Sequence, residues 1–325
     1  MTQYSPRLHN EIYSFIQPAK FKGSLRDKVA LITGSAGTIG RAMAECFAVA
    51  GAKLVLVYNR TPAPAGFKDR CIGLGATSVT FIQCNISELA SCRELVETTE
   101  RSIGSIDVLV NNAGVDHLGP LHSHPPESML DGLGVNLLGP FYLTRLVMPS
   151  FMQRQRGCVI NVASRGGTSD IPFNTIYCTG KAALIRMTSC WQRELDLAGQ
   201  HDIHIYALHP GAVPSNLTSP KSLAEFFVEY PHVGEMLLDS LKDFKDSPYL
   251  SGMVSVALAT GIAKEALKGK YFDAQQDLED VIAQTSAIRA DPELYTLNTS
   301  FLGGLKNDGG TERRPAEDPY HFPGF

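Results

Sequence analysis

The chain has 325 residues, a formal net charge of −4, 44% hydrophobic residues and 19% charged residues. These values are typical of a folded globular protein, and the length suffices for one large α/β domain or two small ones. The basic residues are scattered rather than clustered, and no apolar run reaches the roughly 18 residues that span a bilayer. Residues 1–22 also lack the apolar stretch of a secretory signal. We therefore expect neither a nucleic-acid partner nor a membrane partner.

Short apolar segments alternate with helical patterns along most of the chain. The first segment, 28–33, is followed by glycines and by a helical pattern over 39–50. Further strands are expected at 54–57, 78–82, 107–111, 158–162, 203–208 and 268–273, and further helices at about 67–74, 88–103, 132–153, 175–197 and 252–267. Apolar strands separated by helices predict a parallel sheet with helices on both faces. The expected fold is α/β, a Rossmann-type doubly wound sheet in three layers (α/β/α), as a single domain over residues 25–275.

Two flanking segments and one insert interrupt this alternation. Residues 1–24 are expected to form an N-terminal extension and residues 276–325 a C-terminal extension. The part beyond Lys306 is rich in glycine, proline and charge, which predicts a loose arm. Between about 214 and 248, three prolines separate two amphipathic segments, the first over 223–230. An irregular insert after the end of a strand is typical of a lid over a ligand crevice.

The cysteines and histidines give no sign of a metal or a disulfide framework. The seven cysteines have no Cys-x-x-Cys spacing, and most fall in predicted strands or helices, as reduced cysteines of a cytoplasmic protein do. His122 and His124 flank Ser123 and could mimic a metal-binding pair, but no third ligand is suggested. No metal site is expected.

The glycine-rich turn at 33–40 (TGSAGTIG) lies where the first strand meets the first helix. Glycines there allow backbone amides to approach a pyrophosphate, whose negative charge the helix N-terminus favours. This context predicts a dinucleotide site, the alternative being a merely tight turn. The predicted contacts are Gly34, Ser35, Gly37, Thr38, Ile39 and Gly40.

The end of the second strand bears on which dinucleotide is bound. An NAD site usually has an acidic residue there, which binds the ribose hydroxyls and would repel a 2′-phosphate. Here Asn59, Arg60 and Thr61 follow the strand without a carboxylate. Arg60 with Thr61 could bind a phosphate, although Arg60 could also be a solvated loop residue. The sequence thus favours NADP(H) over NAD(H).

Two further strand ends complete the predicted nucleotide site. Asn85 and Ile86 follow the third strand, where the Asn85 amide could bind the adenine edge or simply form a turn. Asn112, Ala113 and Gly114 follow the fourth strand, and these small residues allow the chain to pass close to the adenosine ribose.

Tyr177 and Lys181 are four residues apart in a predicted helix, and Ser164 precedes Tyr177 by 13 positions. Four residues return two side chains to one helix face, so the Lys181 ammonium is expected beside the Tyr177 phenol, where it would favour the phenolate. A tyrosine that titrates near ~10 is a poor acid or base at neutral pH, but with such help it can exchange a proton with a substrate oxygen. An isolated Tyr-x-x-x-Lys match is more often an ordinary structural pair. The interpretation therefore depends on the glycine turn, on Asn-Asn-Ala-Gly at 111–114 and on Pro-Gly at 210–211.

Taken together, these motifs resemble the short-chain dehydrogenase/reductase superfamily over about residues 28–273. TGSAGTIG, NNAG, VNLLG, VINVAS, YCTGK and HPGAVPS occur in the order and spacing of that family. The flanking segments look like those of a fungal subgroup with an extended C-terminus, often with a role in secondary metabolism. Two positions depart from the pattern, because Thr38 replaces the usual middle glycine, with Gly37 one place earlier, and Asn85 replaces an aspartate.

The resemblance implies a role for each motif residue. Tyr177 would be the general acid in carbonyl reduction and the base in alcohol oxidation, while Lys181 would lower its pKa and hold the nicotinamide ribose. Ser164 would bind the substrate oxygen, and Asn136 would hold a water that relays protons. From the residues alone, Ser164 could instead cap a loop and Asn136 could be an ordinary helix residue. The resemblance further implies that Pro210, Gly211 and Val213 flank the nicotinamide and that Ser215 binds its carboxamide.

The sequence thus predicts an NADPH-dependent reductase of a ketone, another carbonyl compound or an imine. The predicted lid and the loop after Ser164 favour an apolar small-molecule substrate, although their apolar residues could instead pack the lid onto the body. Two alternatives stay open, an NAD-dependent alcohol dehydrogenase and a non-catalytic regulatory or scaffold protein that binds nucleotides. Relatives of such a family pair through two long helices, here 132–153 and 175–197, so a homodimer or homotetramer is expected. The apolar lid and loop residues are Leu217, Leu223, Phe226, Phe227, Tyr230, Met236, Leu237, Ile171 and Phe173.

Overall fold

The computed structural model of the chain describes residues 4–215, 217, 230–304, 307 and 323. Of the amphipathic segment expected at 223–230, only Tyr230 belongs to this set, so that expectation lies outside the described residues. The same holds for the loose arm expected beyond Lys306 and for Leu223, Phe226 and Phe227 of the predicted lid.

Seven parallel strands form one sheet in the order β3-β2-β1-β4-β5-β6-β7. The order reverses between β1 and β4, and in sheets of this kind the ligand crevice opens beyond the carboxyl ends of the strands at that reversal. The pairing aligns functional segments, since Asn111 at the end of β4 lies opposite Asn161 of β5. The strands are β1 Val29–Thr33, β2 Lys53–Tyr58, β3 Ser78–Gln83, β4 Ile106–Asn111, β5 Gly157–Val162, β6 Ile203–His209 and β7 Tyr271–Asp273.

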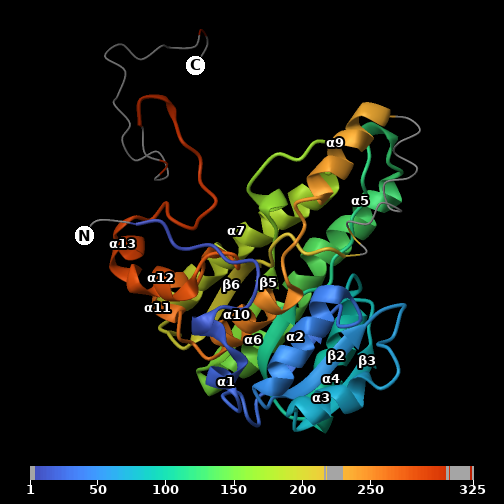
Figure 1. Ribbon diagram of the computed structural model, residues 1–325, viewed down its shortest axis with the longest axis vertical. Helices are drawn as coiled ribbons and strands as arrows, with labels where there is room; N and C mark the ends of the chain where they lie inside the picture. The colour runs from blue at the N-terminus through green and yellow to red at the C-terminus, as the bar shows by residue number, and fades with distance from the viewer. Residues whose placement is uncertain (1–3, 216, 218–229, 305–306, 308–322, 324–325) are drawn as a thin grey trace.

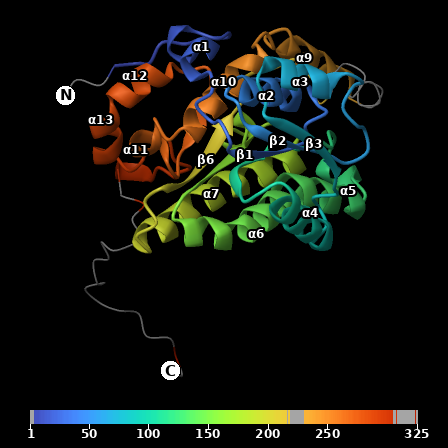
Figure 2. The ribbon, with the colours of Figure 1, turned by 90° about the horizontal axis from the view of Figure 1, so that it is seen from below.

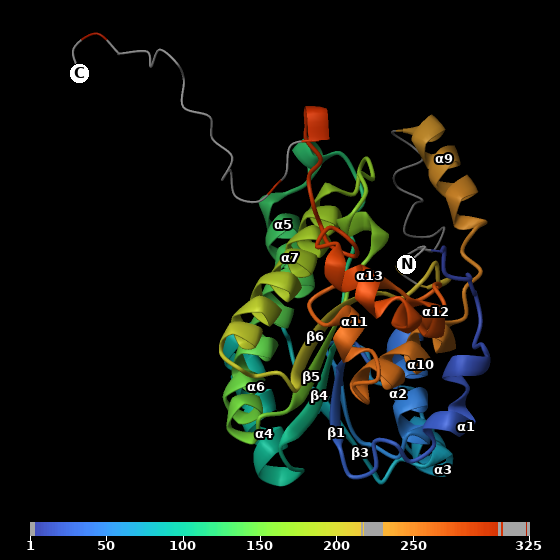
Figure 3. The same ribbon diagram turned by 90° about the vertical axis from the view of Figure 1, so that its left-hand side faces the viewer.

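Helices cover both faces of the sheet, which confirms the predicted three-layer fold (Figures 2 and 3). One face carries α2 Thr38–Val49, α3 Phe67–Leu74 and α10 Pro248–Ala259, and the other carries α4 Leu89–Ser102, α6 Gly139–Arg154 and α7 Thr175–Leu197. The smaller elements are η1 Ser14–Ile16, α1 Pro18–Phe21, η2 Leu121–Ser123, α5 Pro126–Leu133, η3 Gly134–Leu138, η4 Arg165–Gly167, α9 Pro231–Leu241, α11 Lys264–Leu267, α12 Leu278–Ala283, α13 Thr285–Ala290 and η6 Leu302–Gly304.

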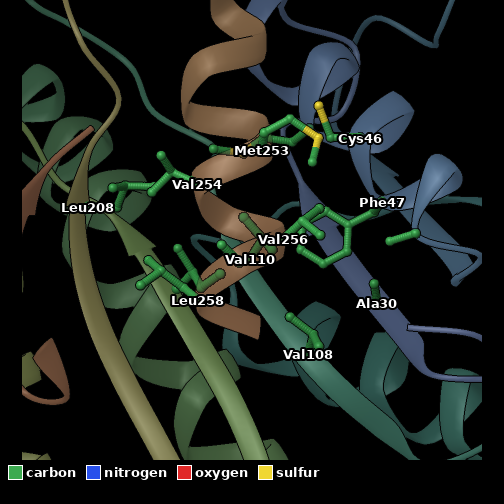
Figure 4. Close-up of a cluster of buried hydrophobic side chains, with 14 of the residues drawn as sticks. Ala30, Cys46, Phe47, Val108, Val110, Leu208, Met253, Val254, Val256 and Leu258 are labelled. Atoms are coloured by element: carbon green, nitrogen blue, oxygen red, sulfur yellow. The ribbon is translucent and has the colours of Figure 1, made fainter. Parts of the chain in front are cut away.

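The core has two layers because successive strand residues point to opposite faces. In β1, Ala30 and Ile32 belong to the buried cluster under α2 and α10, whereas Val29 and Leu31 belong to the cluster on the other face. Figure 4 shows Phe47 of α2 among the residues that α10 and the strands contribute to the first cluster. Every residue of β1 and β6 is buried, which explains why both strands are mostly apolar.

Three predicted elements had the wrong limits. The helix expected from 132 begins at Pro126, because proline is compatible with the first turn of a helix, and it passes through the π-helical turn η3 before it continues as α6. The helix expected over 252–267 is divided into α10 and α11, with Gly261 at a φ of 81° between them. The strand expected from 268 begins at Tyr271, since Gly269 has a φ of 76°.

The described N-terminal segment packs on the body and against α12 and α13. Ile16 and Phe21 near the N-terminus belong to the same buried cluster as Leu278 of α12 and Ile288 of α13. A backbone bridge joins Leu8 to Gln276 in antiparallel orientation, and Figure 1 shows the N-terminal segment beside α12. We call the segment 4–13 the N-terminal arm. None of the described helices has the length and apolar character that a membrane crossing requires.

Candidate active site

A cleft of about 380 Å³ opens at the carboxyl ends of β1 to β5, where the strand order reverses. It brings together 15 residues that the sequence singled out: Gly34, Gly37, Thr38, Ile39, Gly40, Asn59, Asn85, Ile86, Asn112, Ala113, Gly114, Tyr177, Lys181, Pro210 and Ser215. Leu217, which the sequence places in the predicted lid, also lines the cleft, and sequence reasoning missed seven lining residues, Val57, Tyr58, Cys84, Val115, Val135, Val162 and Ala163. Most of these are neighbours of motif residues at strand ends, a position that could have pointed to them.

The glycine turn is built for close approach of the backbone. Gly34 has a φ of 63°, and a Cβ there would lie 2.7 Å from the Cα of Ala113. A Cβ on Gly40 would lie 2.3 Å from the carbonyl oxygen of Gly34. A Cβ on Gly37 would lie 3.5 Å from the same oxygen, an ordinary contact, so the departure from the family pattern at Gly37 and Thr38 leaves the two indispensable glycines in place.

The N-terminus of α2 faces the cleft with unused donors. The helix begins at Thr38 after Gly37, without a side-chain cap and without an acidic residue in its first turn. The first N–H groups of a helix have no partner within the helix, and they carry a partial positive charge. The turn and the helix end therefore fit the pyrophosphate of a dinucleotide.

Two predicted cofactor residues hold the turn in place. Ser35 is fully buried, and its Oγ donates to the carbonyl oxygen of Val57 at 3.0 Å. The Asn112 amide donates to the carbonyl oxygens of Thr33 at 2.9 Å and Gly34 at 3.2 Å. Their side chains thus connect the turn to β2 and to the end of β4.

The adenosine end of the cleft contains no carboxylate among the described lining residues. Asn59 lines the cleft, whereas Arg60 and Thr61 are exposed beside it. The Asn85 amide is occupied locally, since its Nδ2 donates to Glu88 at 2.7 Å and its Oδ1 accepts from the Ser87 hydroxyl at 2.9 Å. This arrangement is the turn-forming alternative for Asn85.

Tyr177 and Lys181 lie side by side at the other end of the cleft, as their spacing on one helix predicts. The Lys181 Nζ lies 5.5 Å from the centroid of the Tyr177 ring and donates to the carbonyl oxygen of Val162 at 2.7 Å. Burial lowers the pKa of Lys181 to about 8.

The Tyr177 phenol behaves differently from the sequence expectation. Burial raises the pKa of Tyr177 to about 12, a hydrogen bond with Ser164 opposes that rise, and the charge of Asp116 adds to it. Lys181 is not among the groups that shift this pKa, since the ammonium lies over the ring and donates to the Val162 carbonyl oxygen, and its expected effect on the phenolate stays a prediction. At neutral pH the phenol keeps its proton, which is the state that a general acid requires.

Ser164 and Asn136 stand on either side of this pair. The Ser164 Oγ accepts from the peptide N–H of Gly166 at 3.1 Å, so it also begins the turn η4. Asn136 lies fully buried in the π-helical turn. Its Oδ1 accepts from the Val115 N–H at 3.2 Å, and its Nδ2 donates to the Val115 carbonyl oxygen at 2.8 Å. A Cβ on Gly114 would lie 3.2 Å from Asn136 Oδ1, a tight contact, and 3.8 Å from Lys181 Nζ, an ordinary one.

The segment after β6 is anchored by a network that the sequence does not reveal. Gly211 has a φ of 94°, and a Cβ there would lie 2.6 Å from Asp246 Oδ2. That oxygen accepts from the Ala212 N–H and from Gln275 Nε2, both at 2.6 Å. Pro210 and Ser215 line the cleft, whereas Val213 is buried. The anchoring residue Asp246 is 34 positions from Ala212, with no motif to mark the contact.

The same network reaches the residue after Ser164. Arg165 donates to Asp273 Oδ2 from Nε at 2.9 Å and from its terminal nitrogen at 2.6 Å. Arg165 also donates to Gln275, which bonds Asp246. The serine loop and the segment 210–215 are therefore fixed to one polar cluster.

No group of three metal-ligating side chains occurs among the described residues, and the seven cysteines are free. The His117 ring is hydrogen-bonded to the Asp131 carboxylate at 2.9 Å.

Comparisons with known proteins agree with this fold. The family model described as short chain dehydrogenase matches residues 28–225. A short chain dehydrogenase of Pseudocercospora fijiensis (strain CIRAD86) is 32% identical over 276 residues, which cover 84% of this chain and 88% of the relative. The galactitol 2-dehydrogenase of Agrobacterium fabrum (strain C58 / ATCC 33970) is 35% identical over 190 residues, which cover 58% of this chain and 72% of the relative. The crystal structure of a metagenomic short-chain oxidoreductase in complex with NADP superimposes with a TM-score of 0.59 at 25% identity, covering 73% of this chain and 92% of that one.

The strand order and the glycine turn at the reversal point are those of a nicotinamide-dependent oxidoreductase of the Rossmann type. The chain belongs to the short-chain dehydrogenase family.

Proposed function

We propose that the protein is an NADPH-dependent reductase of a ketone, another carbonyl compound or an imine, with Ser164, Tyr177, Lys181 and Asn136 as its catalytic set. The observation that carries the proposal is a half-buried tyrosine, Tyr177, whose hydroxyl is hydrogen-bonded with Ser164 and which lines a cleft that starts at a phosphate-binding turn. The dinucleotide supplies a hydride when bound.

The side chains divide the remaining work. The Ser164 hydroxyl orients the substrate oxygen and stabilises the negative charge that develops on it. Tyr177 then donates its proton to that oxygen, which completes the alcohol. Lys181, whose pKa of about 8 leaves it mostly charged at pH 7, favours the phenolate that remains and bonds the nicotinamide ribose. Asn136 keeps Val115 and the Gly114 backbone in position beside Lys181 and holds the water of a proton relay.

Replacing Tyr177 by phenylalanine tests the central role. We expect Tyr177→Phe to lower kcat by at least about 1,000-fold, while the Kd for NADPH changes by less than about threefold, because only the proton donor is lost. Tyr142→Phe, a half-buried tyrosine of α6 outside the cleft, is the matched control. Activity is measured on a panel of ketones by the absorbance of NADPH. If Tyr177→Phe retained the activity of the wild-type protein, the proposal would be excluded.

The preference for NADP(H) is supported by the missing carboxylate at the adenosine end and by Arg60 beside it. The similar crystal structure mentioned above contains NADP. Arg60→Ala should weaken NADPH binding about tenfold through loss of a charge-assisted contact and should leave NADH binding unchanged. Arg93→Ala, an exposed arginine of α4, is the control. Tighter binding of NADH than NADPH by the wild-type protein would instead favour the alternative of an NAD-dependent alcohol dehydrogenase.

The apolar residues near the catalytic end bear on the class of substrate. Leu217 lines the cleft, and in the loop after Ser164 the Phe173 ring lies 5.4 Å from the Tyr230 ring, which supports a largely apolar small molecule. A galactitol dehydrogenase among the relatives suggests that polar substrates also occur in the family.

We propose a homodimer or homotetramer paired through α6 and α7, where the ring of the half-exposed Phe141 lies 5.8 Å from the Trp191 ring between centroids.

We also propose a cytoplasmic location, because seven free cysteines suit a reducing compartment. A role in fungal secondary metabolism, which the flanking segments suggested, belongs to the same proposal.

A further inference from the structure

A second cavity, of about 460 Å³, lies on the face of the sheet that α2, α3 and α10 cover. Residues of these three helices and of the loop before α3 line it, and Figure 2 shows α2 between the other two helices. Of its eleven lining residues, only Thr38 also lines the cofactor cleft. The cavity is therefore a neighbour of the cofactor cleft and not a part of it.

The carboxylate of this cavity already has its partners. Arg70 donates to both oxygens of Glu45, at 2.5 and 3.0 Å, and the Tyr249 hydroxyl donates to Glu45 Oε2 at 2.7 Å. Burial raises the pKa of Glu45, but the hydrogen bonds from Arg70 and Tyr249 outweigh burial and hold this pKa below its usual value. Glu45 is thus ionised, and the charge of Arg70 balances its own.

Arg41 is the charged lining residue that has no such partner. Its half-buried side chain forms no hydrogen bond or ion pair with any residue that the structure describes, and its Nε is buried without an acceptor. The terminal nitrogens of its guanidinium keep accessible surface in the cavity. An arginine is always charged and offers five N–H donors, so one that is half-buried usually has an acceptor. Two arginines and one glutamate therefore leave one positive charge of the lining uncompensated.

The rest of the lining is mostly apolar. Pro64, Ala65 and Phe67 form one side of the cavity, and Ala42 and Pro248 also line it. The volume falls within the range of about 300–1,000 Å³ that is typical of small-molecule sites, and it exceeds the volume of a single phosphate group. The cavity thus combines one free cation with apolar surface for an organic body.

We propose that this cavity binds a small organic anion, a carboxylate on an apolar body, whose charged group pairs with Arg41. A carboxylate matches the planar guanidinium with two parallel hydrogen bonds, and its single charge equals the charge that the lining leaves uncompensated. The body of the ligand would contact Phe67 and the two prolines. The inference does not depend on the proposed reductase function, because the site is separate from the catalytic residues and is tested by binding alone.

Two probes of one shape test the charge requirement. 2-Naphthoate is an anion at pH 7.5, whereas 2-naphthamide is neutral, and the naphthalene fluorescence reports the binding of either. The protein is first saturated with NADP⁺, so that the cofactor cleft is occupied. We expect the naphthoate to bind at least about tenfold more tightly than the amide, the difference that a charge-assisted pair provides.

Substitution of the arginine then tests its role. Arg41→Gln should reduce the preference for naphthoate to less than about twofold, whereas Arg93→Gln, in an exposed arginine of α4, should preserve it. Because Arg41 has no partner among the described residues, Arg41→Gln should leave the Tm within about 2 °C of the wild-type value. If Arg41→Gln is nevertheless unstable, Ala65→Glu provides a second variant, since it places a carboxylate at an exposed position of the lining. Ala65→Glu should abolish the preference, and Ala65→Gln should retain it.

Three results would overturn the inference. The first is equal binding of the two probes to the wild-type protein, and the second is a preference that survives Arg41→Gln or Ala65→Glu. The third is a preference that the free protein and the NAD⁺-saturated protein show but the NADP⁺-saturated protein does not. In that case the cavity would receive the 2′-phosphate of the dinucleotide and not a separate ligand.

Discussion

The glycine turn provides a sharp test of the structure, because two of its glycines should differ in their tolerance of a methyl group. A Cβ on Gly40 would lie 2.3 Å from the Gly34 carbonyl oxygen, whereas a Cβ on Gly37 would lie 3.5 Å from it. Gly37 also has a φ of −75°, which any residue adopts. We therefore expect Gly40→Ala to damage the phosphate site and Gly37→Ala to be tolerated.

The size of the effect follows from the bonds at that oxygen. The Gly34 carbonyl accepts from the Gly37 N–H at 3.1 Å and from Asn112 Nδ2 at 3.2 Å. Making room for a Cβ on Gly40 moves this carbonyl by roughly 1 Å and breaks or weakens both bonds, at about 1 kcal/mol each. The turn is then displaced from the phosphate, so a total loss of about 2–3 kcal/mol in binding, or roughly 30- to 150-fold in Kd, is expected.

The measurement is a fluorescence titration of NADPH, with thermal unfolding as a control for the fold. Gly37→Ala should bind within about threefold of the wild-type protein, because its φ of −75° suits alanine and the added Cβ makes only an ordinary contact of 3.5 Å. Unchanged binding by Gly40→Ala, or equal damage by both substitutions, would refute the geometry of the turn.

Three further predictions concern other parts of the structure. Because folding lowers the Lys181 pKa from 10.5 to about 8, the unfolded chain binds more protons between these values, so stability rises with pH in that window. Between pH 7.5 and 9.5, the free energy of unfolding measured in urea should rise by about 2 kcal/mol more for the wild-type protein than for Lys181→Met. If the two proteins showed the same dependence of this free energy on pH, a buried lysine that changes its charge would be contradicted. Phe47→Ala should cost about 3–5 kcal/mol of stability by the same method, since Phe47 is fully buried between α2 and α10, and a cost below about 1 kcal/mol would disprove its place in the core. Asp246→Leu should weaken NADPH binding about tenfold by freeing the Ala212 N–H, and Asp246→Asn, which keeps an acceptor oxygen, should restore most of the affinity; equal affinities would show that the anchor does not support the cofactor site.

The fold was predictable because its signals are local. β-branched apolar runs such as 29–33 mark buried parallel strands, and each is followed by a helix with one apolar face. The predicted limits of helices were wrong where a residue type that usually ends a helix can also begin one. Pro126 resembles a helix breaker in the sequence, yet it occupies the first turn of α5.

The site was predictable in its membership more than in its interactions. The spacing of Tyr177 and Lys181 correctly predicts that they are neighbours, but a spacing of four does not specify which atom the ammonium approaches. The sequence likewise identifies Asn112 as part of the site but not its bonds to Thr33 and Gly34. Contacts such as Asp246 with Ala212 depend on the tertiary fold and leave no local pattern.

The docking of the N-terminal arm has a consequence for biosynthesis. Arg7 bonds Asp280, 273 positions later, and the Asp277 N–H donates to the Arg7 carbonyl oxygen at 2.8 Å. On the ribosome, Arg7 emerges long before Asp277 and Asp280, so the arm cannot make these contacts until that later segment has been translated. A nascent chain that is released before this point would lack the contacts of the arm however well its sheet had formed.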